Sequence, residues 1–278
     1  MAQNMASLRE MKRRGEPIAM LTCYDYPTAI LMERAGIDVL LVGDSVGTNV
    51  LGYGSEVEVT LDDIRHHVRA VRRGTKSAYL LADLPYRTYE DEAAAVASAR
   101  LLVESGADGV KLEGIRPAIV AALRGAGIDV CAHIGLSMQA QDAVAIKGKT
   151  CAEAAGLFAG ALAVEAAGAQ MVVLELVPEE LAAAISAALA IPTIGIGAGA
   201  RTDGQVLVVH DLLGVTPRAM RHARVYLDLP ALLTPALEGY RADVRTRAFP
   251  AEENLRRMAP GALQEFEGWL RERGQGLP

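Results

Sequence analysis

The chain has 278 residues, of which 51% are hydrophobic and only 4% aromatic, and its net charge is −6. This length suits one large domain or two small ones, and the acidic balance argues against a nucleic-acid-binding surface. The three cysteines, Cys23, Cys131 and Cys151, form no CxxC pair, and no apolar signal segment follows the charged N-terminus. We therefore expect a cytoplasmic protein without disulfides. Residues 181–200 carry no charge, but Pro192 divides them, so we expect no membrane helix.

The first third of the chain is predicted to alternate helices and strands. A helical lead-in over residues 1–15 precedes a strand over 17–22. A helix then runs from Pro27 to Ala35, with Gly36 as its stop. A short buried strand ends before Asp44, and a glycine-rich loop covers residues 47–54. The next helix is capped by Thr60 and ends before Gly74.

The alternation continues to about residue 210. Strands are expected over 78–82, 109–113, 130–132, 171–174, 192–196 and 206–209, and helices over 89–105, about 115–123, 151–167 and 179–190. A long loop covers 134–149, and Thr150 with Glu153 forms a capping-box signature. Eight β-α units predict a (β/α)8 TIM barrel, with a doubly wound open sheet as the alternative. We expect a single domain over 1–278 whose helical tail, about 229–278, caps the barrel or contacts another subunit, with an apolar face of Leu263, Phe266, Trp269 and Leu270.

Ionisable side chains stand where five of these apolar strands end. They are Asp44, Asp83, Glu113, His133 and Glu175, and Lys111 shares a side with Glu113 at strand spacing. Because α/β proteins place their chemistry at the carboxyl ends of parallel strands, we expect these side chains to share one mouth.

The three strand-end carboxylates indicate a magnesium site. Asp44, Asp83 and Glu113 supply the hard oxygen ligands that Mg²⁺ prefers, although such carboxylates also cap helices or pair with Lys and Arg. Lys111 would neutralise an enolate or a carboxylate or form a Schiff base, or it would simply pair with Glu113.

Two further residues are candidates for proton transfer. His133 would act as acid, base or hydrogen-bond donor, unless it is structural. Glu175 follows an apolar run, so burial is expected to raise its pKa toward that of a general base, unless it caps the helix near Pro178. The glycine run 195–199 lacks nucleotide-binding spacing. His66, His67, His210 and His222 are assigned no functional role.

Several segments of the chain resemble the ketopantoate hydroxymethyltransferase family. They span nearly the whole chain in the family's order: LLVGDSVG (40–47), GY (52–53), VTLDDIRHHVRAVRRG (59–74), ADLPY (82–86), GADGVKLEG (106–114), AHIGL (132–136), LELVP (174–178), and IGIGAG with TDGQ and HD (194–211).

The resemblance implies a barrel of the phosphoenolpyruvate mutase/isocitrate lyase type and a role for each candidate. It places Mg²⁺ on Asp44 and Asp83, with Glu113 near the metal. The 2-oxo acid would chelate the metal and contact Ser45 and Lys111. Glu175 matches the family's proton acceptor, and His133 a histidine of the substrate pocket. The implied assembly is a homodecamer of two pentameric rings.

The implied reaction belongs to pantothenate biosynthesis. A hydroxymethyl group passes from methylene-tetrahydrofolate to 3-methyl-2-oxobutanoate through a Mg-stabilised enolate, which gives 2-dehydropantoate. One alternative is a paralogous Mg-dependent aldolase that uses another 2-oxo acid or free formaldehyde. A carbon–carbon lyase of the isocitrate lyase type would need a Lys-x-Cys-Gly loop, which is missing. A non-catalytic metabolite-binding protein would need neither Lys111 nor Glu175.

The sequence departs from the family pattern in loops around the expected mouth. Ser137 and Met138 replace Thr-Pro, residues 86–89 replace a Phe-Gly-Ser-Tyr run, and residues 140–146 replace a glycine-rich aromatic stretch. Glu56 stands where a threonine is common. The metal and base positions are unchanged, so enolisation of a 2-oxo acid is the part of the reaction that the residues support most directly.

Overall fold

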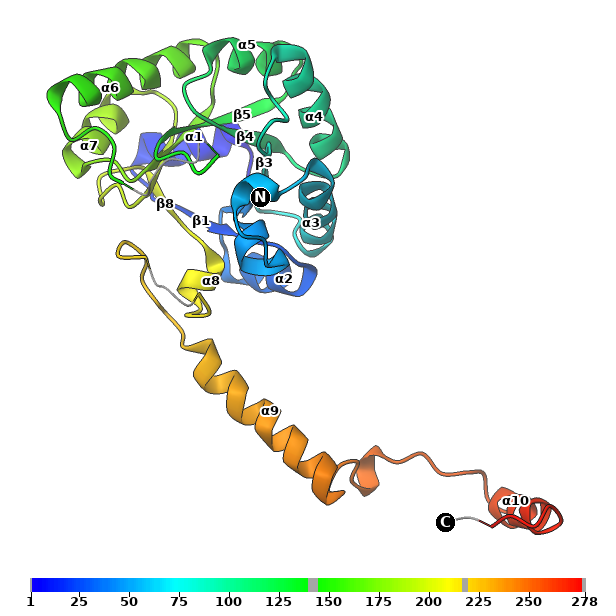
Figure 1. Ribbon diagram of the computed structural model, residues 1–278. Helices are drawn as coiled ribbons and strands as arrows, with labels where there is room; N and C mark the ends of the chain where they lie inside the picture. The colour runs from blue at the N-terminus through cyan, green and yellow to red at the C-terminus, as the bar shows by residue number, and fades with distance from the viewer. Residues whose placement is uncertain (1, 140–144, 217–219, 277–278) are drawn as a thin grey trace. The chain divides into compact units, whose positions relative to one another are not determined.

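The computed structural model describes residues 2–139, 145–216 and 220–276, and it contains a closed parallel barrel (Figure 1). Each strand pairs with its neighbours in sequence, and β1 closes the ring against β8. The predicted TIM barrel is therefore confirmed, and the open sheet is excluded. Within the described residues its strands are β1 (Ile18–Thr22), β2 (Val39–Val42), β3 (Tyr79–Asp83), β4 (Gly109–Glu113), β5 (Asp129–Gly135), β6 (Met171–Glu175), β7 (Thr193–Ile196) and β8 (Gly204–Leu207).

Helices surround the barrel, and their ends follow the expected capping chemistry (Figure 1). Thr60 with Asp63, and Thr150 with Glu153, form capping boxes, and Gly36 ends its helix with a left-handed φ of 75°. The bounds are α1 (Met5–Arg14), α2 (Tyr26–Ala35), α3 (Leu61–Gly74), α4 (Glu92–Glu104), α5 (Pro117–Gly125), α6 (Cys151–Ala166), α7 (Glu179–Ala188) and α8 (Val209–Leu212).

Several element boundaries differ from the predictions; β5, for example, continues to Gly135 instead of ending at residue 132. The expected loop over 47–54 contains a π-helix, η1 (Gly47–Leu51), and a 3-10 turn, η2 (Glu56–Glu58), follows it. The helix expected from residue 89 begins at Glu92, because the Asp91 side chain caps it by accepting from the Ala94 N–H. The last strand begins two residues early, at Gly204, where any Cβ would collide with the backbone of Ile18 on β1.

Side chains along each strand alternate between two apolar layers. Leu40, Leu80, Val110, Ala132 and Val172 face the surrounding helices. Leu41, Leu81, Cys131 and Val173 face the barrel interior. Because both faces are buried, the strands read as uninterrupted apolar runs. Asp83, Lys111, Glu113, His133 and Glu175 continue the interior-facing positions, which fixes them inside the barrel.

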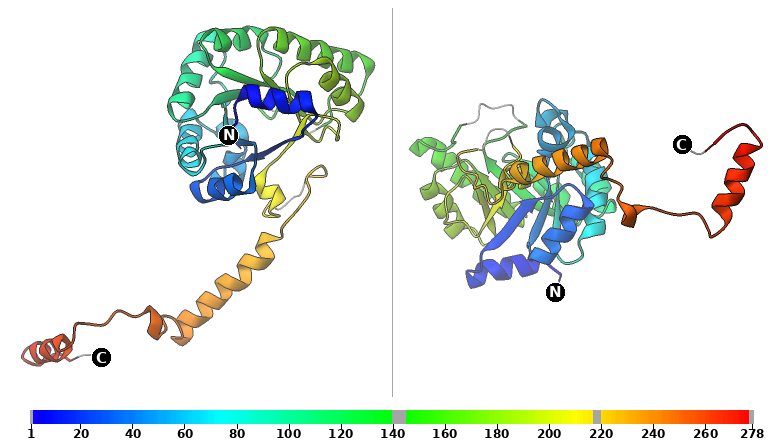
Figure 2. Two further views of the ribbon diagram at one scale, coloured as in Figure 1. Left: turned by 180° about the vertical axis from the view of Figure 1, so that it is seen from behind. Right: turned by 90° about the horizontal axis from the view of Figure 1, so that it is seen from below.

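Helix α1 closes the end of the barrel opposite the strands' carboxyl ends. Its buried side chains Met5, Leu8 and Met11 join the interior layer, and Lys12 pairs with Asp203 at 2.7 Å. The left view of Figure 2 shows α1 lying across the barrel. The polar side chains therefore lie at the other end of the barrel, where the strands have their carboxyl ends.

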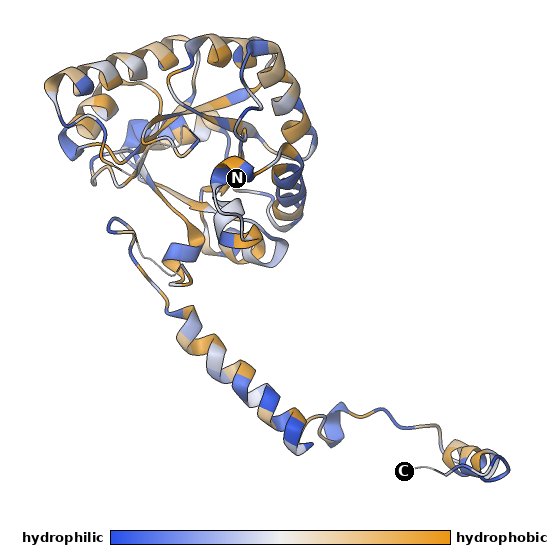
Figure 3. Cartoon of the chain, viewed as in Figure 1, coloured by the Kyte–Doolittle hydropathy of each residue, from blue (hydrophilic) through white to orange (hydrophobic). Residues whose placement is uncertain are grey.

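The residues from Asp228 onward form a second compact unit, which contains α9 (Leu229–Thr246), η3 (Glu252–Asn254) and α10 (Ala262–Arg271). Helix α9 buries no residue, and hydrophobic residues recur along it (Figure 3). On α10, Phe266 and Trp269 stack at 5.8 Å, and Leu270 is buried. The predicted tail contains these helices, whereas the single domain over 1–278 and the tail's role as a cap or a subunit contact stay predictions. No helix in the described part of the chain is long and apolar enough to span a membrane, and the three cysteines are free.

Candidate active site

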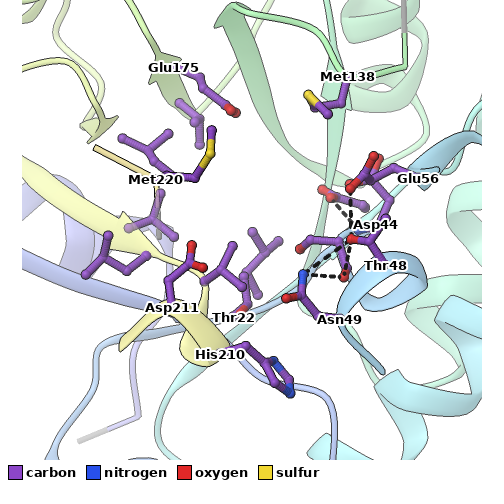
Figure 4. A pocket seen from close by; sticks show the side chains of 18 of the residues that line it. Thr22, Asp44, Thr48, Asn49, Glu56, Met138, Glu175, His210, Asp211 and Met220 are labelled. Carbon is purple, nitrogen blue, oxygen red and sulfur yellow. Dashed lines mark hydrogen bonds between the residues drawn. The ribbon is translucent and has the colours of Figure 1, made fainter. Parts of the chain in front are cut away.

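The carboxyl ends of the strands surround a cavity of about 400 Å³. Figure 4 shows several of its side chains pointing into the opening. Of the seven residues that the sequence assigned to a site, the cavity wall contains six: Asp44, Ser45, Asp83, Lys111, Glu113 and Glu175. The seventh, His133, is not among the described residues that line it.

Asp44, Asp83 and Lys111 form a tightly buried group at one end of the cavity. The Lys111 Nζ donates to Asp83 Oδ1 at 2.8 Å, and the Asp44 backbone N–H donates to Asp83 Oδ2 at 3.0 Å. Lys111 therefore pairs with Asp83. One alternative from the sequence had paired it with Glu113 instead. This pairing follows from the register, in which Asp83 stands directly opposite Lys111.

The charges of this group depend strongly on one another. Burial and the neighbouring Asp83 charge raise the pKa of Asp44 well above its usual range. Burial alone would lower the pKa of Lys111, but the carboxylates of Asp83, Asp44 and Glu113 outweigh it and raise that pKa. A lysine held in its ammonium form stabilises negative charge on a ligand, and it is a poor Schiff-base nucleophile.

Glu113, which lines the cavity, and His133, which does not, form a second buried group. The His133 ring, only 2% exposed, places Nδ1 3.4 Å from Glu113 Oε1 and Nε2 3.3 Å from Glu175 Oε2. Burial alone would lower the pKa of His133, but the two carboxylates raise it to about 9. Burial would raise the pKa of Glu113, but His133, Lys111 and Ser137 together lower it to about 2. The His133 ring thus lies between two carboxylates, which favour its protonated form.

The candidate base Glu175 stands at the end of β6 and is less buried than its neighbours. Its side chain is 20% exposed and points into the cavity (Figure 4). It caps no helix, because α7 has no side-chain cap. The carboxylate is therefore held by His133 from below and is open to a ligand from above.

Gln139, which the sequence analysis did not single out, joins these two groups. Its Nε2 donates to Asp44 Oδ2 at 2.7 Å and to the Leu84 carbonyl at 3.1 Å. Its Oε1 accepts from the Tyr89 hydroxyl, and its backbone N–H donates to Glu113 Oε2 at 3.1 Å. Because Gln139 is 95 residues from Asp44 in the chain, no local pattern could have revealed this contact.

The rim of the cavity also contains residues to which the sequence gave no role. The Tyr24 hydroxyl shares a hydrogen bond of 2.8 Å with Ser45 Oγ, and Thr48 Oγ1 donates to Glu56 at 2.9 Å. His210 and His222 line the cavity wall. The signal that could have found His210 is its place at the end of the eighth strand.

The donor set at Asp44 and Asp83 fits Mg²⁺. Among the described residues no three His, Cys, Asp or Glu side chains form a group that would enclose a metal. Mg²⁺, however, is commonly held by one or two carboxylates together with waters and a substrate. A bound divalent cation would also favour the ionised form of Asp44, which burial and the Asp83 charge disfavour in its absence.

Comparison with known proteins agrees with this geometry. Residues 2–252 match the family model described as ketopantoate hydroxymethyltransferase. The chain belongs to this family. It is 52% identical to the 3-methyl-2-oxobutanoate hydroxymethyltransferase of Chloroflexus aurantiacus, over 92% of this chain and 93% of that protein. It is 46% identical to the enzyme of the same name from Carboxydothermus hydrogenoformans, over 94% and 98%.

Solved structures with the same architecture belong to more distant proteins. A phosphonopyruvate hydrolase, in a complex with oxalate and Mg²⁺, aligns with a TM-score of 0.60 at 13% identity, over 99% of this chain and 98% of that one. A 2,3-dimethylmalate lyase, a member of the phosphoenolpyruvate mutase/isocitrate lyase superfamily, aligns with a TM-score of 0.58 at 17% identity, over 92% and 93%. These likenesses confirm the expected type of barrel.

The departures from the family pattern lie near the cavity. Ser137 donates to Glu113 Oε2 at 2.7 Å, and Met138 lines the wall. Tyr89 contacts Gln139 and accepts from the Glu113 N–H. Residues 140–144 of the replaced aromatic stretch lie outside the described residues.

Proposed function

We propose that this chain is a 3-methyl-2-oxobutanoate hydroxymethyltransferase of pantothenate biosynthesis. It would transfer a hydroxymethyl group from methylene-tetrahydrofolate to the 2-oxo acid and form 2-dehydropantoate. The observation that carries this proposal is a carboxylate pair suited to Mg²⁺, an ammonium group and an accessible carboxylate around one cavity, in a chain of this family.

Asp44 and Asp83 would hold Mg²⁺, and Ser45 and Lys111 would contact the 2-oxo acid. Bound Mg²⁺ would polarise the ketone and make the C–H beside it acidic. Glu113, whose oxygens contact His133, Ser137 and Gln139, would lie near the metal. The Lys111 ammonium would balance the charge that develops on the ketone oxygen.

Glu175 would remove the proton from the carbon beside the ketone, which then attacks the one-carbon unit. His133, whose Nε2 lies 3.3 Å from this carboxylate, would orient it, which is an indirect role rather than contact with substrate. The assignment of His133 as a substrate-binding residue stays a prediction. A binding protein would not need Glu175 left open to the cavity beside an ammonium group.

We place the enzyme in the cytoplasm and propose that it assembles as the homodecamer implied by its family. The uncovered apolar residues of α9 support self-association, because exposed apolar stripes mark interaction surfaces. No partner other than the 2-oxo acid and the folate is needed for the reaction.

The proposal is tested by hydrogen–deuterium exchange at the carbon beside the ketone of 3-methyl-2-oxobutanoate, followed by NMR without folate. We expect exchange with Mg²⁺ and none with EDTA. Glu175→Gln should lower the exchange rate by about 10²-fold or more, because general bases contribute about 10² to 10⁴. The same variant should retain Mg²⁺-dependent binding of the 2-oxo acid in calorimetry.

A wild-type enzyme that binds the 2-oxo acid without exchanging its proton would refute the enolisation step. If exchange occurs but methylene-tetrahydrofolate gives no product, whereas formaldehyde does, the paralogous aldolase becomes the function. Full exchange in Glu175→Gln would instead show that another group is the base.

A further inference from the structure

The cavity has two chemically different sides. One side holds the ammonium group of Lys111 with Asp44 and Asp83, which suits an anionic 2-oxo acid and its metal. The other side is built from the end of β8 and the residues that follow it. Its wall is mostly apolar, and it includes Ile196, Val206, Val208, Val215 and Met220.

Asp211 carries the carboxylate on this side, where His210, Thr216 and His222 also line the wall. The residue is only 8% exposed and lines the cavity, and Figure 4 shows its carboxylate directed into the opening, across from Asp44. Within the described part of the chain its carboxylate makes no hydrogen bond or ion pair, whereas its backbone N–H donates to the Val208 carbonyl and its backbone carbonyl accepts from the Gly214 N–H. A carboxylate that lines the cavity and receives no donor from the described residues is open to hydrogen bonds from a ligand.

The charge of Asp211 restricts what this ligand is. A second carboxylate-bearing 2-oxo acid would be repelled, and an apolar group alone would leave the oxygens unsatisfied. The two oxygens accept best from a pair of adjacent N–H donors on a planar group. The apolar side chains around Asp211 suit the faces of a flat ring.

We propose that Asp211 binds the pterin ring of the folate co-substrate, by accepting hydrogen bonds from its 2-amino group and the adjacent ring N–H. This inference rests on the proposed function, because methylene-tetrahydrofolate is the donor there. The pterin lies along the β8 side of the cavity, with Met220 and Ile196 against its faces. The one-carbon unit is thereby presented toward the 2-oxo acid on the opposite side.

The test is calorimetric binding of 5-formyl-tetrahydrofolate, a stable analogue, to the Mg²⁺-loaded enzyme. Asp211→Asn should weaken binding by about tenfold or more, as expected for hydrogen bonds to a charged group. The folate-independent proton exchange of 3-methyl-2-oxobutanoate should stay within about twofold of the wild type, which also shows that the variant is folded. If the wild type shows no proton exchange, the proposed function is refuted. If Asp211→Asn binds the folate analogue as tightly as the wild type does, only this inference is refuted.

Two comparisons make the assignment specific. Glu56→Gln removes another negative charge from the cavity wall, at a carboxylate already engaged by Thr48. An equal loss of folate affinity in this variant would overturn the direct contact, because it would indicate a general charge effect. An analogue with a methyl group in place of the 2-amino group should bind the wild type about tenfold more weakly and lose little in Asp211→Asn. Equal losses in both enzymes would also overturn the proposal.

Discussion

At the scale of single residues, the site depends on charges that hold one another in place. His133 lies between Glu113 and Glu175, and Lys111 lies against Asp83. Burial by itself would discharge each of these cations, and the carboxylates around them reverse that effect. The protonation states needed for enolisation are therefore set by the strand register, which brings each cation beside its partner.

His133 gives the stability of the protein a pH dependence. Its pKa rises from 6.5 to about 9 on folding, so its stabilising contribution is fully present below about pH 6.5 and is lost as the pH rises through about 9. We expect this group to lower the free energy of unfolding by about 3 kcal/mol between about pH 6.5 and 10. Urea unfolding across this range should show the loss in the wild type. His133→Asn should be less stable at pH 6.5 and flatter in its profile, and a slope equal to that of the wild type would contradict the assignment.

Gln139 is expected to position Asp44 for the metal. Gln139→Ala removes the donor to Asp44 Oδ2 and the acceptor for Tyr89. We expect Mg²⁺ affinity, measured by calorimetry, to fall about 10- to 100-fold, as for other residues that orient metal ligands. Gln205→Ala is a matched control, because Gln205 also donates twice but to Gly199 and Thr202. Equal Mg²⁺ affinities in both variants would show that Asp44 needs no such support.

At the scale of elements, the adjacent ends of β5 and β6 fix the position of Glu175, the proposed base. Gly135 pairs with Glu175 in register and has a φ of 116°. A Cβ at this position would collide with the carbonyl oxygen of Glu175. The end of β5 therefore requires glycine both for its backbone conformation and for the close approach of β6.

Gly135→Ala is expected to destabilise the protein by about 2 kcal/mol or more, because it combines a strained φ with a steric clash. It should also reduce proton exchange, since the displaced strand end carries Glu175. Gly125→Ala, at the end of α5, has no neighbour near its Cβ and should be neutral or stabilising. Urea unfolding of both variants measures the difference. A Gly135→Ala protein as stable as the wild type would mean that β5 and β6 separate at little cost.

At the scale of the whole molecule, α9 carries an apolar stripe that is exposed among the described residues. Leu233, Leu237, Tyr240 and Val244 recur at helical spacing and are 46–61% exposed. Such a stripe is costly in a monomer, so we expect it to be covered in the assembled protein.

Leu237→Lys places a charge in this stripe and should lower the mass of the assembly in sedimentation equilibrium. Glu238→Lys, one residue along α9, introduces the same side chain outside the stripe and should leave the mass unchanged. An unchanged mass in Leu237→Lys would indicate that the stripe covers the enzyme's own barrel instead.

The sequence by itself determined the barrel, because local signals repeat in it eight times. Apolar runs of strand length, capping boxes at Thr60 and Thr150, and a glycine stop at Gly36 each specify one element, and their alternation leaves few topologies. The five ionisable strand ends were also readable, since a parallel barrel places all such ends on one face.

The tertiary structure alone decided which of these side chains touch. Three contacts join residues that are 28 to 95 positions apart in the chain. They are the pair of Lys111 and Asp83, the approach of His133 to Glu175, and the hydrogen bond from Gln139 to Asp44. Asp211 lies in the HD segment after the eighth strand, but only the tertiary structure shows that its carboxylate lines the cavity. Periodicity specifies which way a side chain faces, whereas partners depend on register, loop path and burial, which form only when the barrel closes.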